Sequence, residues 1–521
     1  MTAPDRLREG PTVAELQRSI FGAHPERQAI SSPREAMTYG QLDAAINRTA
    51  RLFLGAGLKQ GDGLAILSSN RIEVVLANWA AQRLGLRYTP LHPRGSLSDH
   101  LYILDHAQIS ALVIDDVVFG ERGREIAAAT SLPALFSMEG SIGTGLEAAA
   151  CGLSNEPCWA DTREDDLCNI FFTGGTTGRP KGAAHTNRSI AAMTLLSLAT
   201  WDWPRDIRFL LAAPVSHAGG AMLMPTLLRG GSFHMVERFR PEEFLREIED
   251  KRITATFLVP TMLYDLLDCP ALDRFDLSSL EMVIYGAAPM SPSRLADAIR
   301  RIGPVFCQLY GQTEAPNLVT YLSRGDHDPD NAERLSSCGR PVPGVGVAIL
   351  AENGTVCAAG QVGEIAVRGP LVMQGYWRDA EQTAETMHDG WLRTGDLAVA
   401  DEEGFLTIVD RAKDLIISGG FNVYSREVED CLVTYPGVRA AAVVGLPHER
   451  WGEMVAAFIV ASDGPKPEPS QLVEHVKARK GDVYAPKVIE FVDALPVTAV
   501  GKIDKKAIRQ TYWKGHSRSV S

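Results

Sequence analysis

The chain has 521 residues, 45% of them hydrophobic, so we expect more than one domain and a sizeable core. Its formal charge is −12, from 52 Lys and Arg against 64 Asp and Glu, which argues against nucleic-acid binding through a broad basic surface. The N-terminus has no apolar secretion signal, and no stretch approaches the roughly 18 apolar residues of a membrane span, so we expect a soluble cytoplasmic protein. The eight scattered cysteines form no CxxC pair, so we expect them to be free buried thiols.

Helix and strand patterns alternate near the start of the chain. Thr38 and Gln41 form a capping box that opens an amphipathic helix, and Gly55 and Gly57 end it. Strand and helix patterns then alternate at 63–69, 72–85, 88–91, 97–107 and 111–115. This alternation predicts a parallel sheet covered by helices.

The alternation resumes in the middle of the chain and changes character after about residue 335. Candidate strands lie at 208–214, 255–260, 280–286 and 304–311, and candidate helices lie at 241–251 and 291–301. Short strands separated by turn residues predict a small β subdomain, at 339–350, 362–370 and 404–410. The remaining segment has the size of a separate α/β domain, so we divide the chain into 1–410 and 411–521.

The segment 170–185, IFFTGGTTGRPKGAAH, has the composition of an anion-binding loop. Its glycine amides, threonine hydroxyls and one lysine could cradle a phosphate: Thr173, Gly174, Gly175, Thr176, Thr177, Gly178 and Lys181. It is not the P-loop of NTPases, because Pro180 stands where that motif needs glycine, and GAGLKQG and GTGLEA are poor dinucleotide fingerprints. An ordinary surface turn between a strand and a helix is the alternative interpretation.

Four more motifs follow the loop in order. LYGQTEA ends a candidate strand with Thr313 and Glu314, and WLRTGD ends in Asp396. The segment 410–429 contains Arg411 and a glycine pair, and PVTAVGKIDKK presents Lys502 in a turn. Together with the loop, these motifs closely resemble the adenylate-forming superfamily of acyl-CoA synthetases, peptide-synthetase adenylation domains and firefly-type luciferases. The resemblance runs from about residue 35 to about residue 510.

The resemblance implies an α/β fold with a large N-terminal domain of helix-covered sheets plus a small β subdomain, and a smaller, mobile α+β C-terminal domain. It also implies a two-step reaction that uses ATP, Mg²⁺ and coenzyme A. A carboxylate attacks the α-phosphorus of ATP and expels pyrophosphate, and a thiol then displaces AMP from the acyl-adenylate. The first step crowds negative charge, so it needs preorganised donors, positive charge and a metal.

The family pattern gives individual residues roles in that reaction. The loop from Thr173 to Gly182 holds the β- and γ-phosphates, Thr313 bonds the α-phosphate, Glu314 holds Mg²⁺, and Lys502 bridges the substrate carboxylate and the α-phosphate. The nucleoside is held by a ribose pair, an adenine wall and a stacking ring: Asp396 with Arg411, Tyr285 with Gly286, Ala287, Ala288 and Pro289, and Tyr310. Taken singly, Glu314 could be a helix-start acid, Asp396 a turn residue and Lys502 a solvated surface lysine.

The resemblance also assigns residues to a swing of the C-terminal domain between two poses. Lys413 matches the hinge position. Gly419 and Gly420 match the segment that lines the pantetheine tunnel, where missing side chains let a thin chain pass. A simple turn is the alternative interpretation of the glycine pair.

The stretch PVSHAGG bears on the identity of the acid. Amino-acid-activating relatives carry an aspartate here, whereas this chain has His217 and no acid, which argues against an amino-acid substrate. His217 lines the acid pocket or is a packed core histidine. Gly311 leaves the pocket open, Leu309 narrows it, and the apolar run 222–224 fits an acyl group or a packed helix. We expect a medium-chain fatty or aromatic carboxylic acid.

Three positions depart from the family pattern. Gly174 replaces a serine, Asn187 a histidine and Ser425 a proline, and none of these changes removes a charged catalytic group. Two other functions stay open: loading of a carrier-protein pantetheine instead of free CoA, and nucleotide binding without catalysis. A homodimer also stays open.

Overall fold

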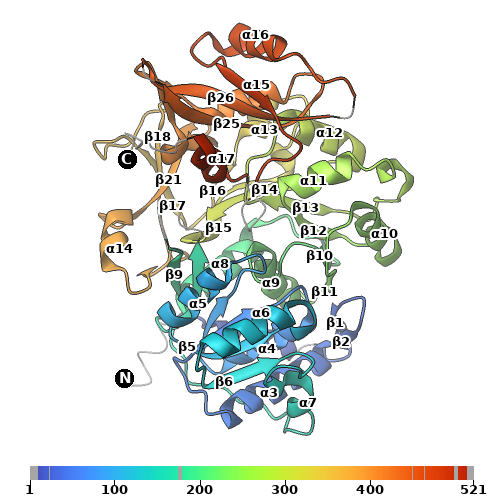
Figure 1. The fold of residues 1–521 in the computed structure, drawn as a ribbon. Coiled ribbons are helices and arrows are strands. Elements are labelled where there is room, and N and C mark those ends of the chain that lie inside the picture. The colour runs from blue at the N-terminus through green and yellow to red at the C-terminus, as the bar shows by residue number, and fades with distance from the viewer. Residues whose placement is uncertain are drawn as a thin grey trace.

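The structure, a computed structural model, describes residues 10–22, 24–173, 179–448, 450–462, 464–497 and 503–512. Two large sheets with their helices form the lower and middle parts of the molecule in Figure 1, and the C-terminal residues form a separate sheet at the top. No helix in the described ranges is long and apolar enough to cross a lipid bilayer.

The first alternating segment folds into an eight-stranded sheet of order β19-β9-β8-β4-β3-β5-β6-β7. Its body is parallel: β3 (Gly63–Leu67), β4 (Arg87–Pro90), β5 (Ile109–Ile114), β6 (Ala134–Ser137), β7 (Thr144–Gly145) and β8 (Leu167–Thr173). One edge is antiparallel, with β9 (Lys181–Thr186) and β19 (Gly375–Tyr376). The predicted parallel sheet is therefore confirmed for the body and wrong for this edge, where β9 follows β8 without a crossover helix.

The helices of this part begin where the sequence predicts, and α4 and α5 end two residues and one residue earlier than predicted. The Thr38 side chain and the Gln41 side chain form the capping box of α3 (Tyr39–Gly55), and Leu42, Ile46 and Phe53 are buried along it. The other predicted helices are α4 (Ile72–Arg83) and α5 (Leu97–His106), and α6 (Asp116–Ala129) follows them.

A nine-stranded sheet follows, of order β16-β15-β14-β13-β12-β10-β11-β1-β2, and the strands toward its edges include β16 (Arg340–Pro341), β15 (Ala315–Leu322) and β2 (Ala36–Thr38). Its parallel centre contains the four predicted strands: β10 (Arg208–Leu211), β12 (Ala255–Leu258), β13 (Met282–Gly286) and β14 (Phe306–Gln312), with β11 (Ser232–Met235) beside them. The predicted helices are α10 (Pro241–Lys251) and α12 (Pro292–Ile302). No sequence pattern predicted β1 (Gln28–Ser31), which pairs in parallel with β11 and brings the N-terminal segment into this second sheet.

Two smaller sheets complete the fold. The predicted β subdomain is an antiparallel sheet of β17 (Gly346–Leu350), β18 (Gly363–Arg368), β20 (Met387–His388), β21 (Trp391–Ala400) and β22 (Leu406–Arg411). The last sheet contains β23 (Ile416–Ser418), β24 (Phe421–Val423), β25 (Val438–His448), β26 (Gly452–Ala461) and β27 (Val488–Phe491). It packs with α15 (Ser425–Leu432), α16 (Pro469–Lys480) and α17 (Lys505–Tyr512) around hydrophobic clusters separate from the one that runs from Val13 to Leu406.

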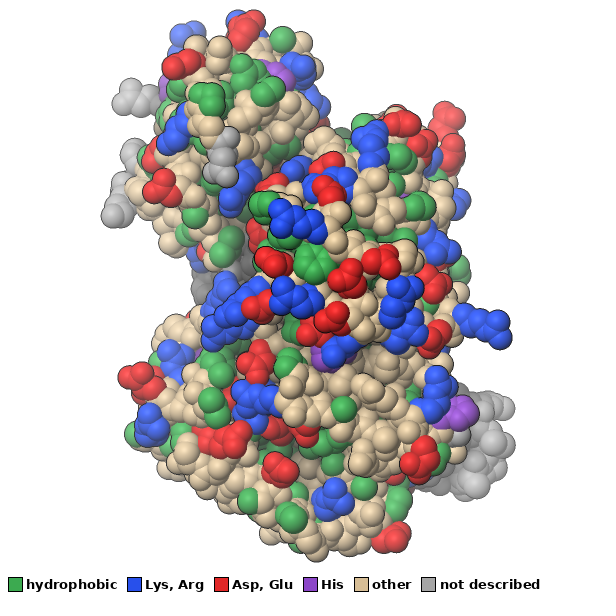
Figure 2. All heavy atoms as spheres, turned by 90° about the vertical axis from the view of Figure 1, so that its right-hand side faces the viewer, with side chains coloured by type: hydrophobic (Ala, Val, Ile, Leu, Met, Phe, Trp, Pro, Cys, Tyr) green, Lys and Arg blue, Asp and Glu red, His purple; other side chains and the backbone are tan. Residues whose placement is uncertain are grey.

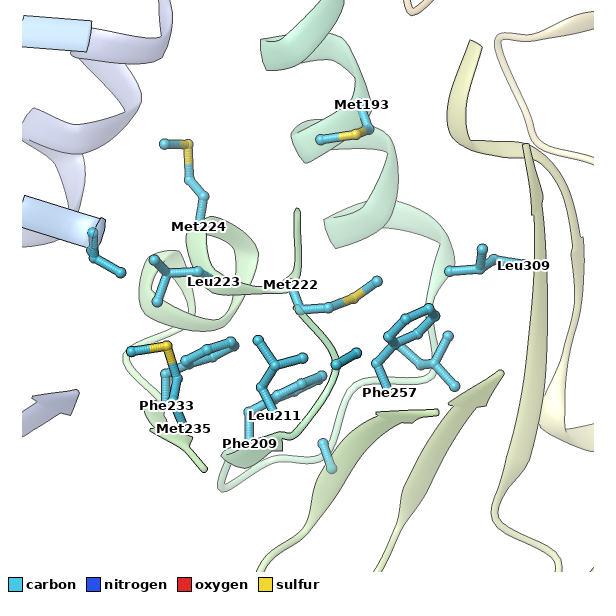
Figure 3. Packing of buried hydrophobic residues seen from close by; sticks show 14 of the residues in the cluster. Met193, Phe209, Leu211, Met222, Leu223, Met224, Phe233, Met235, Phe257 and Leu309 are labelled. Carbon is cyan, nitrogen blue, oxygen red and sulfur yellow. The ribbon is translucent and has the colours of Figure 1, made fainter. Parts of the chain in front are cut away.

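The apolar run at 222–224 belongs to the core. It ends a 3-10 helix (Ala218–Met222) and starts α9 (Leu223–Leu228), and all three side chains are buried. Figure 3 shows them among the buried residues of the nine-stranded sheet. The packed-helix interpretation of this run is therefore confirmed.

The cysteines and the surface charge can be compared with the composition. All eight cysteines are free thiols, as expected, but only four of them are buried: Cys168, Cys307, Cys338 and Cys431. On the face drawn in Figure 2, the Lys and Arg side chains of the described residues are interspersed with Asp and Glu. This face has no broad basic surface.

Candidate active site

The candidate phosphate loop joins two antiparallel strands. Thr173 ends β8 and pairs with Lys181, the first residue of β9, while Gly174, Gly175, Thr176, Thr177 and Gly178 lie outside the described residues. The alternative interpretation of a turn between a strand and a helix is wrong, because α8 (Asn187–Thr200) starts only after β9. The Lys181 ammonium group donates to Oε1 of Gln382, on α14 (Ala380–Thr386), and lies 5.7 Å from the centre of the Tyr376 ring.

Thr313 and Glu314 form the turn between β14 and β15 (Ala315–Leu322). Glu314 therefore lies in a strand-to-strand turn, and the alternative of a helix-start acid is wrong. The Tyr376 hydroxyl donates to Oε1 of Glu314 at 2.7 Å, and the amide of Met373 donates to the Glu314 carbonyl at 2.8 Å. Burial and the Glu314 carboxylate raise the pKa of Tyr376, so the phenol stays a donor at neutral pH.

His185 supports the same turn from β9. Its Nε2 donates to the Thr313 carbonyl at 2.8 Å, and its ring is fully buried. Burial lowers the pKa of His185 to about 4, so the imidazole is neutral near pH 7. The backbone of Thr313 is therefore held by the side chain of His185, a residue that lies outside the TEA motif.

Three of the predicted nucleoside-binding residues meet at one carboxylate. Asp396 lies within β21, directly opposite Arg411 in β22, so the alternative of a turn residue is wrong. Arg411 Nε lies 2.8 Å from Asp396 Oδ1, and the Tyr310 hydroxyl donates to Oδ2 at 2.7 Å. The Asp396 charge raises the pKa of Arg411. Burial is the main cause that raises the pKa of Tyr310, and the Asp396 charge is the second cause. The Asp396 carboxylate is buried, and each of its two oxygens has a donor group as its partner.

The segment predicted as an adenine wall follows β13. Gly286 lies opposite Leu309 of β14, and a Cβ atom at Gly286 would come 2.5 Å from the Leu309 carbonyl oxygen. Ala287 has a left-handed φ of 66°, an uncommon conformation for a residue with a side chain, and Ala288 follows it. Only glycine fits at 286, and the backbone at Ala287 is strained, which is a frequent property of binding sites.

Gly311 lies at a β-bulge. The register of β14 and β15 shifts between Tyr310 and Gln312, and a Cβ atom at Gly311 would come 2.4 Å from the amide nitrogen of Asn317. The hairpin itself therefore requires glycine at this position. Leu309 is buried in the large core cluster.

His217 lies at the end of the nine-stranded sheet that carries the adenine-wall segment. It follows β10, it is half-buried, and its Nδ1 lies 2.8 Å from the Ser216 hydroxyl. Its ring packs edge-on against His92, with 4.9 Å between the ring centres. Burial lowers the pKa of His217 to about 4, so the ring is neutral. Asn70 holds this loop, since its amide donates to the Ala213 carbonyl and its oxygen accepts from the Val215 amide.

The remaining predicted residues lie beyond β22. Lys413 is in a single 3-10 turn, Ala412–Asp414. Gly419 and Gly420 have φ values of 59° and 84° and form the two-residue turn between β23 and β24. The turn interpretation of this pair is thus confirmed as local structure, and the tunnel role stays a prediction. Lys502 lies outside the described residues, next to Ile503, which forms a bridge with Val497.

Two of the departures from the family pattern have partners. Asn187 accepts from the Val13 amide and donates to the carbonyls of Arg163 and Asp166, so it ties the start of α2 (Val13–Phe21) to the segment just before β8. The Ser425 hydroxyl donates to Asp410 at 2.8 Å. Both polar side chains are buried and satisfied.

Sequence motifs missed several residues that hold the site together. Tyr376 and Gln382 contact Glu314 and Lys181, and His185 contacts Thr313. Their partners lie between 62 and 201 positions away in the chain. A single sequence contains no local signal for such contacts.

The chain resembles known proteins over most of its length. Residues 17–377 match the family model of AMP-binding enzymes, and residues 427–502 match the model of the AMP-binding enzyme C-terminal domain. The medium/long-chain-fatty-acid–CoA ligase FadD8 of Mycobacterium tuberculosis is 47% identical over 95% of this chain and 89% of its own length. A feruloyl-CoA synthase of Amycolatopsis sp is 36% identical, over 94% and 99%. The structure of the amide bond synthetase McbA from Marinactinospora thermotolerans has a TM-score of 0.88 and 36% identity, over 96% of this chain and 99% of that one.

Proposed function

Because the chain belongs to the AMP-binding enzyme family, we propose that it joins a medium-chain fatty or aromatic carboxylic acid to coenzyme A at the expense of ATP. The observation that carries the proposal is the meeting of Tyr310 and Arg411 at the Asp396 carboxylate. A buried carboxylate of this kind, bordered by an aromatic ring and a guanidinium group, is suited to accept hydrogen bonds from the ribose hydroxyls of a nucleotide.

The first step forms a bond between a carboxylate oxygen of the acid and the α-phosphorus of ATP, and the bond to the pyrophosphate leaving group breaks. Lys181 and the loop before it would bind the outer phosphates, and Thr313 would bind the α-phosphate. Lys502 would approach from the C-terminal domain and neutralise charge on both reactants. In the second step the thiol sulfur attacks the acyl carbon, AMP leaves, and the thiol proton passes to solvent.

Glu314 is suited to a magnesium ion that arrives with ATP. No cluster of three or more His, Cys, Asp or Glu side chains that could hold a metal exists within the described ranges. A single carboxylate is what Mg²⁺ uses when phosphate oxygens and waters fill its other positions. When bound, the ion would neutralise phosphate charge, while the protein groups orient the reactants.

The domain division at Asp410 belongs to the same proposal. The separate hydrophobic clusters beyond Ile416 support an independent C-terminal unit of 411–521. Lys413, in the 3-10 turn after Arg411, would be the hinge, and the exposed Gly419–Gly420 turn would border the pantetheine path.

The first test measures pyrophosphate release over a panel of acids, with ATP and Mg²⁺, followed by transfer to free CoA, to a carrier-protein pantetheine or to an amine. We expect release with medium-chain or aromatic acids and thioester formation with CoA. Transfer to the carrier protein alone would favour the carrier-loading function. The absence of pyrophosphate with every acid would favour the non-catalytic alternative and contradict the proposal.

The second test separates the two half-reactions with Lys502→Ala. Loss of one preorganised donor should slow adenylate formation about 10²- to 10³-fold, and thiolysis of a supplied acyl-adenylate should stay near the rate of the unchanged protein. The matched control is Lys506→Ala, four positions along the same segment. An equal loss in both half-reactions would contradict the role of Lys502.

A further inference from the structure

Residues 373–386, here called the strap, contain β19 and α14 and precede β20 of the β subdomain. The strap pairs with β9 through β19, where Gly375 lies opposite Ala184 and Tyr376 opposite Ala183. The Trp377 amide donates to the Gly182 carbonyl at 2.7 Å. The strap is thus fixed to the strand that begins with Lys181.

The strap also fixes the acidic turn. The Met373 amide donates to the Glu314 carbonyl at 2.8 Å, and the Tyr376 hydroxyl donates to Glu314 Oε1 at 2.7 Å. The Glu314 residue is only 8% exposed, so its carboxylate has little access to bulk water. A phenol bound to Oε1 restrains the rotation of the carboxyl group and leaves Oε2 as the oxygen able to take a further partner.

Tyr376 itself is held from both sides. Its amide donates to the Thr383 hydroxyl at 2.9 Å, and that hydroxyl donates to the Asp379 carbonyl at the start of α14. On its other side, the Lys181 ammonium group lies 5.7 Å from the ring centre and is bound by Gln382 of the same helix. One short segment therefore touches both charged groups that the proposed function assigns to the phosphates and the metal.

We propose that Tyr376 is a positioning residue, which orients the Glu314 carboxylate so that Oε2 faces the metal that accompanies ATP. This inference rests on the proposed function of Glu314. Partners that orient a metal ligand are typically worth 10- to 100-fold in metal affinity, because the ligand otherwise samples other rotamers. Tyr376 would act only through Glu314 and would not touch the nucleotide.

The test uses Tyr376→Phe in the full chain, which removes the hydroxyl and keeps the ring beside Lys181. Titration calorimetry compares ATP binding with Mg²⁺ and with EDTA. We expect the Kd for ATP with Mg²⁺ to rise about tenfold and the Kd in EDTA to stay unchanged. The Mg²⁺ concentration for half-maximal pyrophosphate release should rise by a similar factor.

The matched control is Tyr39→Phe, in α3. The Tyr39 hydroxyl donates to the carbonyls of Leu227 and Gly231 and is buried, so this change also removes a buried phenol contact, far along the chain from the strap. We expect a lower Tm for this variant and an unchanged Mg²⁺ titration. An equal rise in the required Mg²⁺ concentration in both variants would mean that losing any buried phenol contact destabilises the protein enough to weaken Mg²⁺ binding, and it would overturn the inference.

A double-mutant cycle gives the sharper result. In a Glu314→Gln background, Tyr376→Phe should change the Kd for ATP with Mg²⁺ no further, because the hydroxyl acts through that carboxylate. Additive effects of the two substitutions on the Kd would overturn the inference. Identical Mg²⁺ titrations of Tyr376→Phe and the unchanged protein would also overturn it. So would the finding that the unchanged protein binds ATP no better with Mg²⁺ than in EDTA. If no acid gives pyrophosphate, the proposed function fails, while the calorimetric comparison still decides the role of Tyr376.

Discussion

His185, which bonds the turn that carries Thr313, makes the unfolding free energy of the protein depend on pH. The ring is buried, and its Nε2 donates to the Thr313 carbonyl, so the neutral form is the one that fits. Its pKa is lowered from 6.5 to about 4 by burial. In the unfolded chain the same ring takes up a proton near its ordinary pKa of 6.5. Between these two values the unfolded state binds more protons, so stability rises with pH and is lost as the pH falls.

We predict that His185→Gln flattens this pH dependence. Glutamine can still donate to the Thr313 carbonyl but does not titrate. As the pH falls from about 6.5 to about 5, the unchanged protein should lose about 2 kcal/mol more unfolding free energy than the variant. Urea unfolding at a series of pH values measures the difference, and the other buried histidines cancel because both proteins have them. Parallel pH curves would contradict the prediction.

The β14–β15 hairpin shows what local sequence signals contain and what they omit. The pattern at 304–311 predicts β14, and the sequence places Thr313 and Glu314 correctly after it. The pocket interpretation of Gly311 came from the family pattern, whereas the structure requires glycine because the backbone of Asn317 lies 2.4 Å from a Cβ atom there. A bulge is a property of two paired strands, so one strand read alone cannot reveal it.

The same limit applies to the rest of the fold and the site. Capping boxes and hydrophobic periodicity predicted α3, α4 and the parallel strands, because those signals lie within one segment. They could not predict β1 or the Tyr376–Glu314 contact, since both depend on partners far away in the chain. The motifs identified the charged groups of the site, and the packing that orients those groups came only from the structure.

We predict that Gly311→Ala weakens the hairpin without changing the acid preference. The added methyl group meets backbone atoms, so the unfolding free energy should fall by about 1–3 kcal/mol. The rate of pyrophosphate release should fall by the same factor for every acid, because the shifted hairpin carries Thr313 and Glu314, which act on ATP and not on the acid. Gly55→Ala is the control, since a Cβ atom at Gly55 meets nothing within 4 Å. A changed acid preference at unchanged stability would instead support the pocket interpretation.

At the scale of the whole molecule, a largely buried cluster of charged and polar groups ties the last helix to the strand before the proposed hinge. The Lys505 ammonium group lies 2.7 Å from Glu429 Oε1 and donates to the Ser425 hydroxyl at 2.7 Å. Ser425 in turn donates to Asp410, in β22. The cluster therefore anchors the start of α17, and Lys505 follows the proposed catalytic Lys502 by three positions in the sequence.

We predict that Lys505→Met costs about 3 kcal/mol of unfolding free energy, because the largely buried Glu429 carboxyl group loses its ion-pair partner and must take up a proton or remain an unpaired charge. Denaturant unfolding measures the loss, and Lys505→Met with Glu429→Leu should recover much of it. Lys477→Met is the control, since Lys477 forms a solvent-exposed ion pair with Asp482 whose loss should change the unfolding free energy little. Equal losses in the two single variants would show that the cluster is not an anchor.

The pairing of β1 with β11 has a consequence for synthesis on the ribosome. Ile30 pairs with Phe233, so β1 leaves the exit tunnel about 200 residues before its partner. At about 5–20 residues per second, its main-chain hydrogen-bonding groups wait roughly 10–40 s for that partner. During this interval the edge of the nascent segment is open to other chains, so we expect the newborn polypeptide to depend on chaperones most strongly before β11 has been translated.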